Sequence, residues 1–190
     1  MANRSLPGEH VNGIAHLKQP LHCTDGERRE FARLVREGFH GSDESLPDRI
    51  RGASCLGFQY AADDTLAAVA ALKLPNERYR EEVFAAAEAG ASPADFELEL
   101  GWVFVVPSHR GSRIAESLCR LLMAPVPRAR VFATTRPENV SMIRILLALG
   151  FVRTGKPFPR RDEELVLFLR STPTIGVHHK KSGHEVRLGP

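Results

Sequence analysis

The chain has 190 residues, of which 43% are hydrophobic and 26% are charged, and its formal net charge is +3. This length is typical of one domain with a sizeable core, and the composition is that of an ordinary globular protein. The small positive charge does not by itself indicate a nucleic-acid-binding protein, and it is equally compatible with a few arginines that bind a phosphorylated ligand. No apolar run approaches the roughly 20 residues of a membrane-spanning helix.

Residues 1–16 are polar and contain glycine, and we expect them to form a loosely ordered N-terminal segment. They lack the apolar stretch of a signal peptide, which favours a cytoplasmic protein. Cys23, Cys55 and Cys119 are widely separated. Their spacing fits neither a disulfide framework nor a zinc site, so we expect no metal and reduced, mostly buried thiols.

The first half of the chain predicts a strand, a helix, a hairpin and a second helix. A strand is expected over 17–23, and a helix follows over 24–39, where Thr24 and Glu27 match a capping box. A polar loop comes next. The hairpin strands and the second helix are expected at 55–63, 65–75 and 79–90.

The second half begins with the clearest strand pattern, over 95–107. In this strand the apolar residues alternate with Glu97, Glu99 and Gly101 and are expected to share one face of a sheet; they are Phe96, Leu98, Leu100, Trp102 and Phe104. Two helices then alternate with three strands, at 112–124, 129–135, 138–150, 151–158 and 164–171. This order predicts an α+β fold with α/β/α layers, in which helices flank a mixed, mostly antiparallel sheet of about six to seven strands.

We expect residues 17–171 to form a single domain. Residues 172–190 turn polar, with His178, His179 and His184 among lysines and glycines. The spacing of these histidines suits no defined metal site, so we expect a flexible tail.

The junction of the 95–107 strand with the next helix reads "VVPSHRGSRIAESL". Pro107 is expected to end the strand, while Gly111 and Ser112 allow a ligand to approach the backbone closely. The following helix begins with unpaired N–H groups and the positive end of its dipole, and Arg110 and Arg113 add charged donors. The stretch is therefore either a plain tight turn or a phosphate-binding turn.

A second motif, "NVSMIRILLALGF" over 139–151, changes the balance between these alternatives. Together the two motifs resemble the GNAT superfamily of acyl-CoA-dependent N-acyltransferases. The pyrophosphate loop of that family, Arg/Gln-x-x-Gly-x-Gly/Ala, matches residues 110–115, and its Asn–helix–Leu-Gly-Phe motif matches Asn139 and residues 149–151. The resemblance is good from about Phe96 to Arg170.

This resemblance implies a GNAT-like twisted sheet that is splayed open beside the strand ending at Pro107. It also implies acetyl-CoA as the acetyl donor. Backbone amides near Phe104, Val105 and Val106 would hold the pantetheine arm, and Asn139 would contact the cofactor near the second helix. The pyrophosphate would lie on the turn formed by Arg110, Gly111, Ser112, Arg113, Ile114 and Ala115.

Two positions depart from the family pattern. Arg113 stands where the loop usually has its second glycine, and we expect ordinary helical backbone angles there, which an arginine tolerates. Leu146 stands where many members have the tyrosine that protonates the leaving thiolate. Ser141 and Cys119 are possible substitutes, but each is better explained as structural, so no acid is assigned.

Two carboxylates are candidates for the base that removes a proton from the acceptor. Glu97 and Glu99 lie on one face of the 95–107 strand, and in many relatives a carboxylate on this strand acts directly or through a water. Glu99 is the better candidate because it lies nearer the expected splay. A solvated polar face on a half-exposed strand is an equally good interpretation.

The resemblance thus implies an N-acetyltransferase that moves an acetyl group to a primary amine by direct attack in a ternary complex. The acceptor is a small molecule, a peptide N-terminus, a lysine or an aminoacyl-tRNA, and the sequence does not distinguish these. We expect no membrane association, and a monomer or a homodimer. The main alternative is a catalytically silent acyl-CoA-binding sensor or interaction domain, which the missing tyrosine favours, and a structural nucleic-acid-binding domain comes third.

Overall fold

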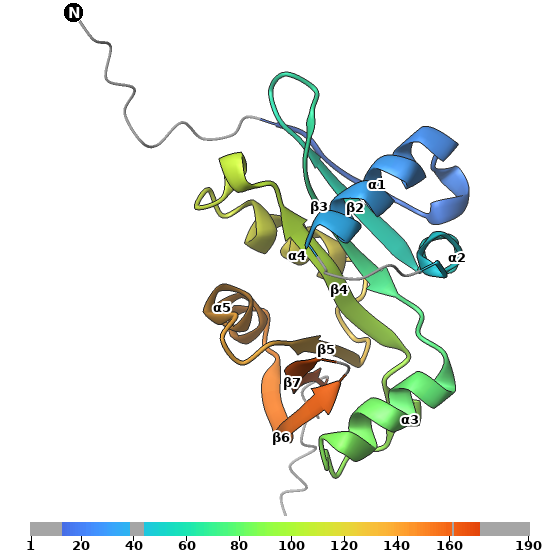
Figure 1. The fold of residues 1–190 in the computed structure, drawn as a ribbon, viewed down its shortest axis with the longest axis vertical. Coiled ribbons are helices and arrows are strands. Elements are labelled where there is room, and N and C mark those ends of the chain that lie inside the picture. Colours follow the sequence, from blue (N-terminus) through green and yellow to red (C-terminus); the bar gives the residue numbers. More distant parts are fainter. Residues whose placement is uncertain (1–12, 39–43, 161, 172–190) are drawn as a thin grey trace, which may run out of the picture.

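A seven-stranded sheet in the order β1-β2-β3-β4-β5-β7-β6 forms the centre of the molecule in a computed structural model, which describes residues 13–38, 44–160 and 162–171 (Figure 1). Neighbouring strands pair antiparallel except β4 and β5, which are parallel. This is the mixed, mostly antiparallel sheet that the sequence predicts. The strands are β1 (Ala15–Lys18), β2 (Cys55–Tyr60), β3 (Leu66–Lys73), β4 (Leu98–Val105), β5 (Val131–Thr135), β6 (Val152–Arg160) and β7 (Glu163–Arg170).

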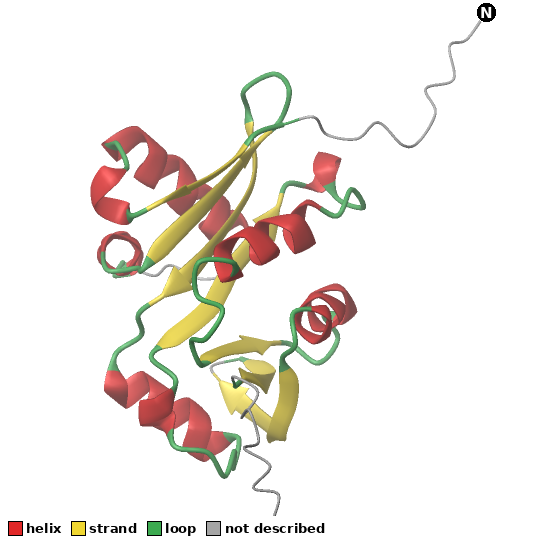
Figure 2. Ribbon diagram, turned by 180° about the vertical axis from the view of Figure 1, so that it is seen from behind, coloured by secondary structure: helices red, strands yellow, loops and turns green. Residues whose placement is uncertain are grey.

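Helices cover both faces of the sheet (Figure 2). On one face, residues of β2 and β3 such as Phe58 and Val69 pack under the first two helices, and Phe132 of β5 packs under the third. On the other face, Ala70 and Leu72 of β3 pack under the last two helices. The helices are α1 (Asp25–Gly38), α2 (Leu46–Arg51), α3 (Glu77–Ala86), α4 (Ile114–Met123) and α5 (Val140–Ala148).

The start of α1 confirms the predicted capping box. Glu27 Oε2 accepts a hydrogen bond from the Thr24 amide at 2.8 Å, and Thr24 Oγ1 accepts one from the Glu27 amide at 3.2 Å. The predicted strand over 17–23 is wrong at both ends, because β1 spans Ala15–Lys18 and Pro20 begins a single 3-10 turn. Residues 15 and 16 therefore belong to the sheet rather than to the N-terminal segment.

A β-bulge in β4 overturns the predicted single apolar face of that strand. Ala71 pairs with Gly101 and Val69 pairs with Phe104, so the two β4 residues between them oppose Ala70 alone. Trp102, within the bulge, has a φ of 52°. One extra residue reverses the alternation of side chains from that point on. Leu100 consequently packs under α4, whereas Trp102 and Phe104 pack under α1 and α2.

The two central strands separate soon after they meet. β4 and β5 pair only at Leu98–Val131 and Glu99–Phe132, although β4 continues to Val105 and β5 to Thr135. Within the described residues, β4 beyond Glu99 has register partners in β3 alone. The sheet is thus splayed at the predicted place.

Two parts of the predicted organisation lie outside the described residues: most of the N-terminal segment, and the tail from residue 172 with its three histidines. The division into segment, domain and tail stays a prediction. Among the helices that the structure describes, none combines the length and the apolar composition that crossing a bilayer requires.

Candidate active site

The predicted phosphate turn, residues 110–115, lies in the connection from β4 to α4 and at the start of that helix. The Val106 amide donates a hydrogen bond to Ala67 O at 2.9 Å, which ties the end of β4 to β3. A 3-10 turn over Pro107–His109 follows, and Gly111 has a φ of 84° with no atom within 4 Å of where a Cβ would lie. Gly111 therefore leaves the backbone open to a ligand at the point where α4 begins, and the first amides of α4 have no acceptor within the helix.

Arg113 contradicts our expectation of helical angles at this position. It lies directly before α4 with φ 60° and ψ 13°, in the left-handed region. A residue with a Cβ is strained there by roughly 1–2 kcal/mol, which is why the family pattern has glycine. The conformation turns the chain into α4 and leaves the Arg113 side chain exposed beside the first turn of the helix.

Arg110 is held at the end of β4. Its Nε donates a hydrogen bond to Val105 O at 3.1 Å, and its guanidinium carbon lies 5.7 Å from the centre of the Phe104 ring. Ile114, in contrast, is buried in the core under α4, so only its backbone is available to a ligand. The contacts that we predict for pantetheine at residues 104–106 and for pyrophosphate at residues 110–115 stay predictions.

Asn139 has a structural role at the second motif. Its Oδ1 accepts a hydrogen bond from the Met142 amide at 3.1 Å and so caps the start of α5. The predicted contact of Asn139 with the cofactor stays a prediction.

The position of the missing acid, Leu146, and its two possible substitutes have different surroundings. Leu146 is fully buried in the core between α5 and the sheet. Burial also raises the pKa of the Cys119 thiol to about 12, which makes it a poor proton donor. Ser141 is exposed on α5. Cys119 is therefore a core residue, in agreement with its structural interpretation.

The two candidate carboxylates differ sharply in exposure. Glu97 is exposed and precedes β4, whereas Glu99 is only 3% exposed. Glu99 Oε1 lies 2.7 Å from Lys73 Nζ and accepts a hydrogen bond from the Tyr79 hydroxyl at 3.3 Å. The solvated-face interpretation is therefore wrong for Glu99 and holds for Glu97.

The second oxygen of Glu99 is buried without a partner. Within the described part of the chain, Oε2 has no hydrogen-bond partner, although its accessible area is below 1 Å². A buried acceptor without a partner is costly and calls for an explanation. It belongs to the last β4 residue that pairs with β5, so the unpartnered oxygen is carried by the residue at which the sheet begins to open.

Lys73 and Tyr79, which hold Glu99 in place, were not predicted from the sequence. Lys73 ends β3, pairs in register with Glu99, and extends over Gly101, where a Cβ would lie 2.8 Å from Lys73 Cε. Asn76 accepts a hydrogen bond from the Tyr79 amide at 2.8 Å and so caps α3, which carries the tyrosine. A single lysine ending the otherwise apolar run of β3 was the available signal.

Burial governs the protonation of this cluster. It lowers the pKa of Lys73 below its ordinary 10.5, and the charge of Glu99 and its hydrogen bond oppose that shift. It also raises the pKa of Tyr79, and the negative charge of Glu99 adds to the rise. Tyr79 thus stays a protonated donor near neutral pH, while the contact with Glu99 favours the charged form of Lys73.

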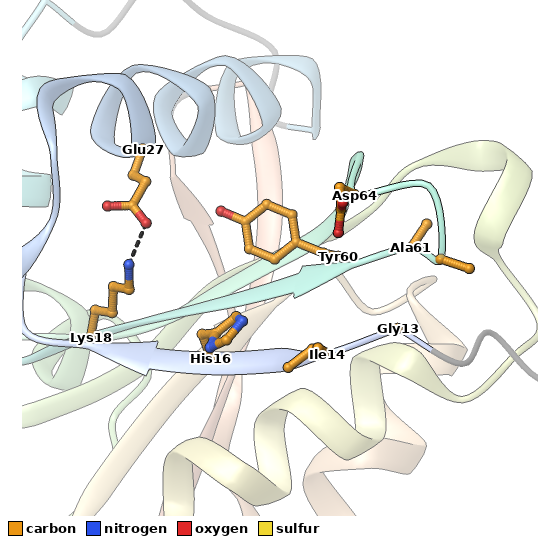
Figure 3. Close-up of a pocket in the computed structure, with 9 residues that line it drawn as sticks. Gly13, Ile14, His16, Lys18, Glu27, Tyr60, Ala61 and Asp64 are labelled. Atoms are coloured by element: carbon orange, nitrogen blue, oxygen red, sulfur yellow. Dashed lines mark hydrogen bonds and ion pairs between the residues drawn. The ribbon is translucent and has the colours of Figure 1, made fainter.

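A separate hollow of about 370 Å³ lies between α1 and the strands β1 and β2 (Figure 3). Lys18 and Glu27 face each other there as an ion pair, with His16 and Tyr60 beside them. This hollow shares no lining residue with the phosphate turn or with the Glu99 cluster. We therefore do not assign the catalytic site to it.

The structure combines a splayed mixed sheet, a glycine turn leading into a helix N-terminus and a buried carboxylate beside the splay. This combination points to the class of acyl-group transferases. The sequence model of the Acetyltransferase (GNAT) family matches residues 24–151. The chain belongs to this family, and it is an acyltransferase whose family uses acyl-CoA donors and amine acceptors. No curated protein sequence matches the chain.

Solved structures show the same fold. FeeM, an N-acyl amino acid synthase from uncultured soil microbes, superposes with a TM-score of 0.66 at 14% identity, covering 86% of this chain and 92% of its own. Escherichia coli ElaA superposes with a TM-score of 0.61 at 10% identity, covering 84% of this chain and 99% of its own. A GNAT acetyltransferase from Streptococcus agalactiae superposes with a TM-score of 0.59 at 19% identity, covering 83% of this chain and 95% of its own. At these identities the likeness concerns the fold.

The first prediction tests the phosphate turn. Gly111→Asp places a carboxylate where we expect the pyrophosphate, and the open surroundings allow the protein to stay folded. Acetyl-CoA at a hundredfold excess over its Kd should stabilise the wild type by roughly 2.7 kcal/mol, measured as a thermal shift, and the variant should lose most of it. Gly90→Asp is the matched control, since Gly90 also has a positive φ and open surroundings. Equal shifts in all three proteins would exclude the turn as the site.

The second prediction separates strain from binding at Arg113. Arg113→Gly removes a side chain from a left-handed position, so the ligand-free protein should gain up to about 1 kcal/mol in free energy of unfolding. If the guanidinium contacts the pyrophosphate, the same variant should bind acetyl-CoA about 10-fold more weakly in calorimetry. A variant with unchanged affinity would show that Arg113 has no role in binding.

The third prediction concerns the buried ion pair. Glu99→Gln removes the carboxylate that pairs with the buried Lys73 amine, which should cost about 3–5 kcal/mol at neutral pH. Lys73 loses the two interactions that raise its pKa, so its folded-state pKa falls further below 10.5. Between that pKa and 10.5 the unfolded chain binds more protons than the folded protein, so stability rises with pH. The difference in free energy of unfolding between wild type and variant, measured by chemical denaturation, should therefore shrink toward pH 10.5. A difference that stays constant with pH would contradict this explanation.

Proposed function

We propose that the protein transfers an acetyl group from acetyl-CoA to a primary amine by direct attack in a ternary complex, with Glu99 as the proton acceptor. The observation that carries the proposal is that Glu99 Oε2, buried where β4 and β5 part, has no hydrogen-bond partner within residues 13–38, 44–160 and 162–171. On the other face of the sheet, α4 presents its N-terminus beside Arg110 and Arg113. A thioester between the strands would thus have its phosphates near α4 and its carbonyl near Glu99.

The chemistry balances with the residues at hand. The amine lone pair attacks the thioester carbonyl, the C–N bond forms, and the tetrahedral intermediate breaks its C–S bond to release CoA as a thiolate. Glu99 Oε2 takes the proton that the nitrogen loses, directly or through one water. A thiol with a pKa of about 8.5 is a fair leaving group, so water can protonate the thiolate in place of the tyrosine that Leu146 replaces.

Lys73 and Tyr79 position Glu99 in this scheme. Both bond Oε1, which holds the carboxylate in one orientation and leaves Oε2 for the acceptor. An α-amine, with a pKa of about 8, gives up its proton more readily than a lysine-like amine, whose pKa is about 10.4.

The direct route is supported by the state of the thiols. An acyl-enzyme would need a reactive thiolate, yet burial raises the pKa of Cys23 and Cys55, and that of Cys119 to about 12. Incubation with acetyl-CoA and a panel of amines, with thiol release and product mass as readouts, tests the transfer. Binding without thiol release is the outcome that the silent-sensor alternative predicts. The acetyl group itself is tested by comparing acetyl-CoA with longer acyl-CoA donors.

The fourth prediction separates catalysis by Glu99 from its structural role. Glu99→Gln should lower kcat/KM by about 10²–10⁴, and the loss should shrink as pH rises, because more acceptor arrives deprotonated. The double variant Lys73→Met with Glu99→Gln removes both charges, so its free energy of unfolding should recover toward that of the wild type while its activity stays low. Glu97→Gln, at an exposed carboxylate, should stay within about twofold of wild type. A double variant that regains activity would make Glu99 structural.

The acceptor class, the cytoplasmic location and the choice between a monomer and a homodimer stay predictions. The neighbour FeeM is an N-acyl amino acid synthase, but its likeness to this chain concerns the fold.

A further inference from the structure

Arg160, the last residue of β6, lies over the tyrosine that bonds Glu99. The guanidinium carbon of Arg160 is 4.4 Å from the centre of the Tyr79 ring, and the Tyr79 hydroxyl donates a hydrogen bond to Glu99 Oε1 at 3.3 Å. Glu99 is 3% exposed, whereas the Arg160 side chain is 32% exposed. An arginine near the surface is thus connected to the buried carboxylate through one aromatic ring.

A backbone contact fixes β6 against the far end of α3. The Lys156 amide donates a hydrogen bond to Ala87 O at 2.8 Å, and Lys156 Nζ forms an ion pair with Glu88 at 2.6 Å. At Gly155, which has a φ of 72°, a Cβ would lie only 2.0 Å from Ala87 O. Only glycine allows this close approach, so the position of β6 beside α3 is well defined.

The same strand also reaches the start of α3. The four residues from Lys156 to Arg160 span about 13 Å as a strand, and the eight residues from Ala87 to Tyr79 span about 12 Å as a helix. One segment of β6 can therefore contact both ends of the helix. Arg160 Nη1 lies 4.0 Å from Glu82 Oε2, one turn after Tyr79, so the guanidinium lies along one face of α3.

A surface ion pair alone does not explain where Arg160 lies. Glu82 Oε1 is 2.9 Å from Arg78 Nε, whereas its other oxygen is 4.0 Å from Arg160. A partly exposed pair at the longer distance contributes little to stability. The contact with the Tyr79 ring is the better explanation of the arginine's position.

The cation over the ring affects the hydroxyl of Tyr79 as well as the orientation of the ring. Burial and the charge of Glu99 raise the pKa of Tyr79, and the charge of Arg160 opposes that rise. A phenol beside a cation is a stronger hydrogen-bond donor, because the cation stabilises negative charge on its oxygen. The attraction between a guanidinium and a ring face also restricts both groups to one arrangement. Arg160 therefore strengthens and directs the hydrogen bond to Glu99.

We infer that Arg160 is a positioning residue for Glu99: it holds the Tyr79 hydroxyl on Oε1, so that Oε2 keeps facing the acceptor amine. Its effect on catalysis rests on the proposed function, in which Glu99 takes the proton. The inference adds a residue of β6, beyond the opening between β4 and β5, to the control of a carboxylate on β4. Arg160 itself does not touch the reacting atoms in this scheme.

Steady-state kinetics test the inference with variants of similar size. Arg160→Met keeps an apolar side chain but removes the cation, and Arg160→Lys returns a cation to the ring. Arg78→Met is the matched control, because Arg78 also pairs with Glu82 but has no ring contact among the described residues. For each protein, kcat and KM are measured by thiol release, with acetyl-CoA and the most reactive amine of the panel.

Arg160→Met should lower kcat about 3- to 30-fold, as expected for the loss of one cation–ring contact, while KM for acetyl-CoA and the melting temperature hardly change. Arg160→Lys should recover most of this loss, and Arg78→Met should stay within about twofold of wild type. Adding Arg160→Met to Tyr79→Phe should cost no further activity, because the arginine acts through the hydroxyl that phenylalanine lacks.

A spectroscopic measurement needs no turnover. NMR of protein with isotope-labelled glutamate Cδ carbons gives a signal for Glu99, assigned by its absence from the double variant Lys73→Met with Glu99→Gln. At constant pH, Arg160→Met and Tyr79→Phe should move this signal in the same direction, and Arg160→Lys should leave it near its wild-type position. In the Tyr79→Phe background, Arg160→Met should not move it further.

The outcomes separate this inference from the proposed function. Activity of Arg160→Met within about twofold of wild type, or losses that multiply when Arg160→Met is combined with Tyr79→Phe, overturns the inference and leaves the transferase intact. Absence of thiol release with every amine overturns the proposed function. The Glu99 signal then decides the inference alone: a shift that requires the Tyr79 hydroxyl supports it, and an unmoved signal, or an equal shift without that hydroxyl, overturns it.

Discussion

The parallel pairing of β4 with β5 ends after two residue pairs, and the candidate site depends on that early end. A strand inside a sheet bonds two neighbours, whereas β4 beyond Glu99 keeps one, β3. Its other edge is left for a ligand that can bond to backbone groups. The opening between β4 and β5 also connects the two faces of the sheet, so that phosphates held at α4 and an amine beside Glu99 can belong to one reacting complex.

The Lys73–Glu99 pair occupies the gap between the aromatic residues under α1 and those under α3. Burying two charges is expensive, and hydrophobic residues of the same size often give a more stable protein. The pair is thus better explained by the orientation that it gives the carboxylate than by stability. Gly101 makes room for Lys73, and α3 supplies the tyrosine, so β3 and α3 together hold one oxygen, while the other has no hydrogen-bond partner among the described residues.

Local patterns were enough to predict much of the fold, because they report local physics. The capping box at Thr24, the glycine turn at residue 111 and the order of strands and helices follow from neighbours a few residues apart. The bulge at Trp102 could not be predicted, since strict alternation assumes that no extra residue interrupts the pairing. The Lys73–Glu99 contact also escaped prediction, because it depends on how β3 and β4 align across 26 residues of chain. Arg113 was misjudged because sequence does not report φ.

The parting of β4 and β5 also divides the molecule mechanically. Strands β1–β4 form one lobe and β5–β7 a second, and two register pairs near Glu99 join their backbones. Beyond this junction the two lobes are held together by side chains packed between α4, α5 and the sheet rather than by backbone hydrogen bonds. A cofactor that contacts both β4 and α5 would link the two lobes. The donor would then stiffen the scaffold that receives the second substrate, which gives a physical reason for donor to bind before acceptor.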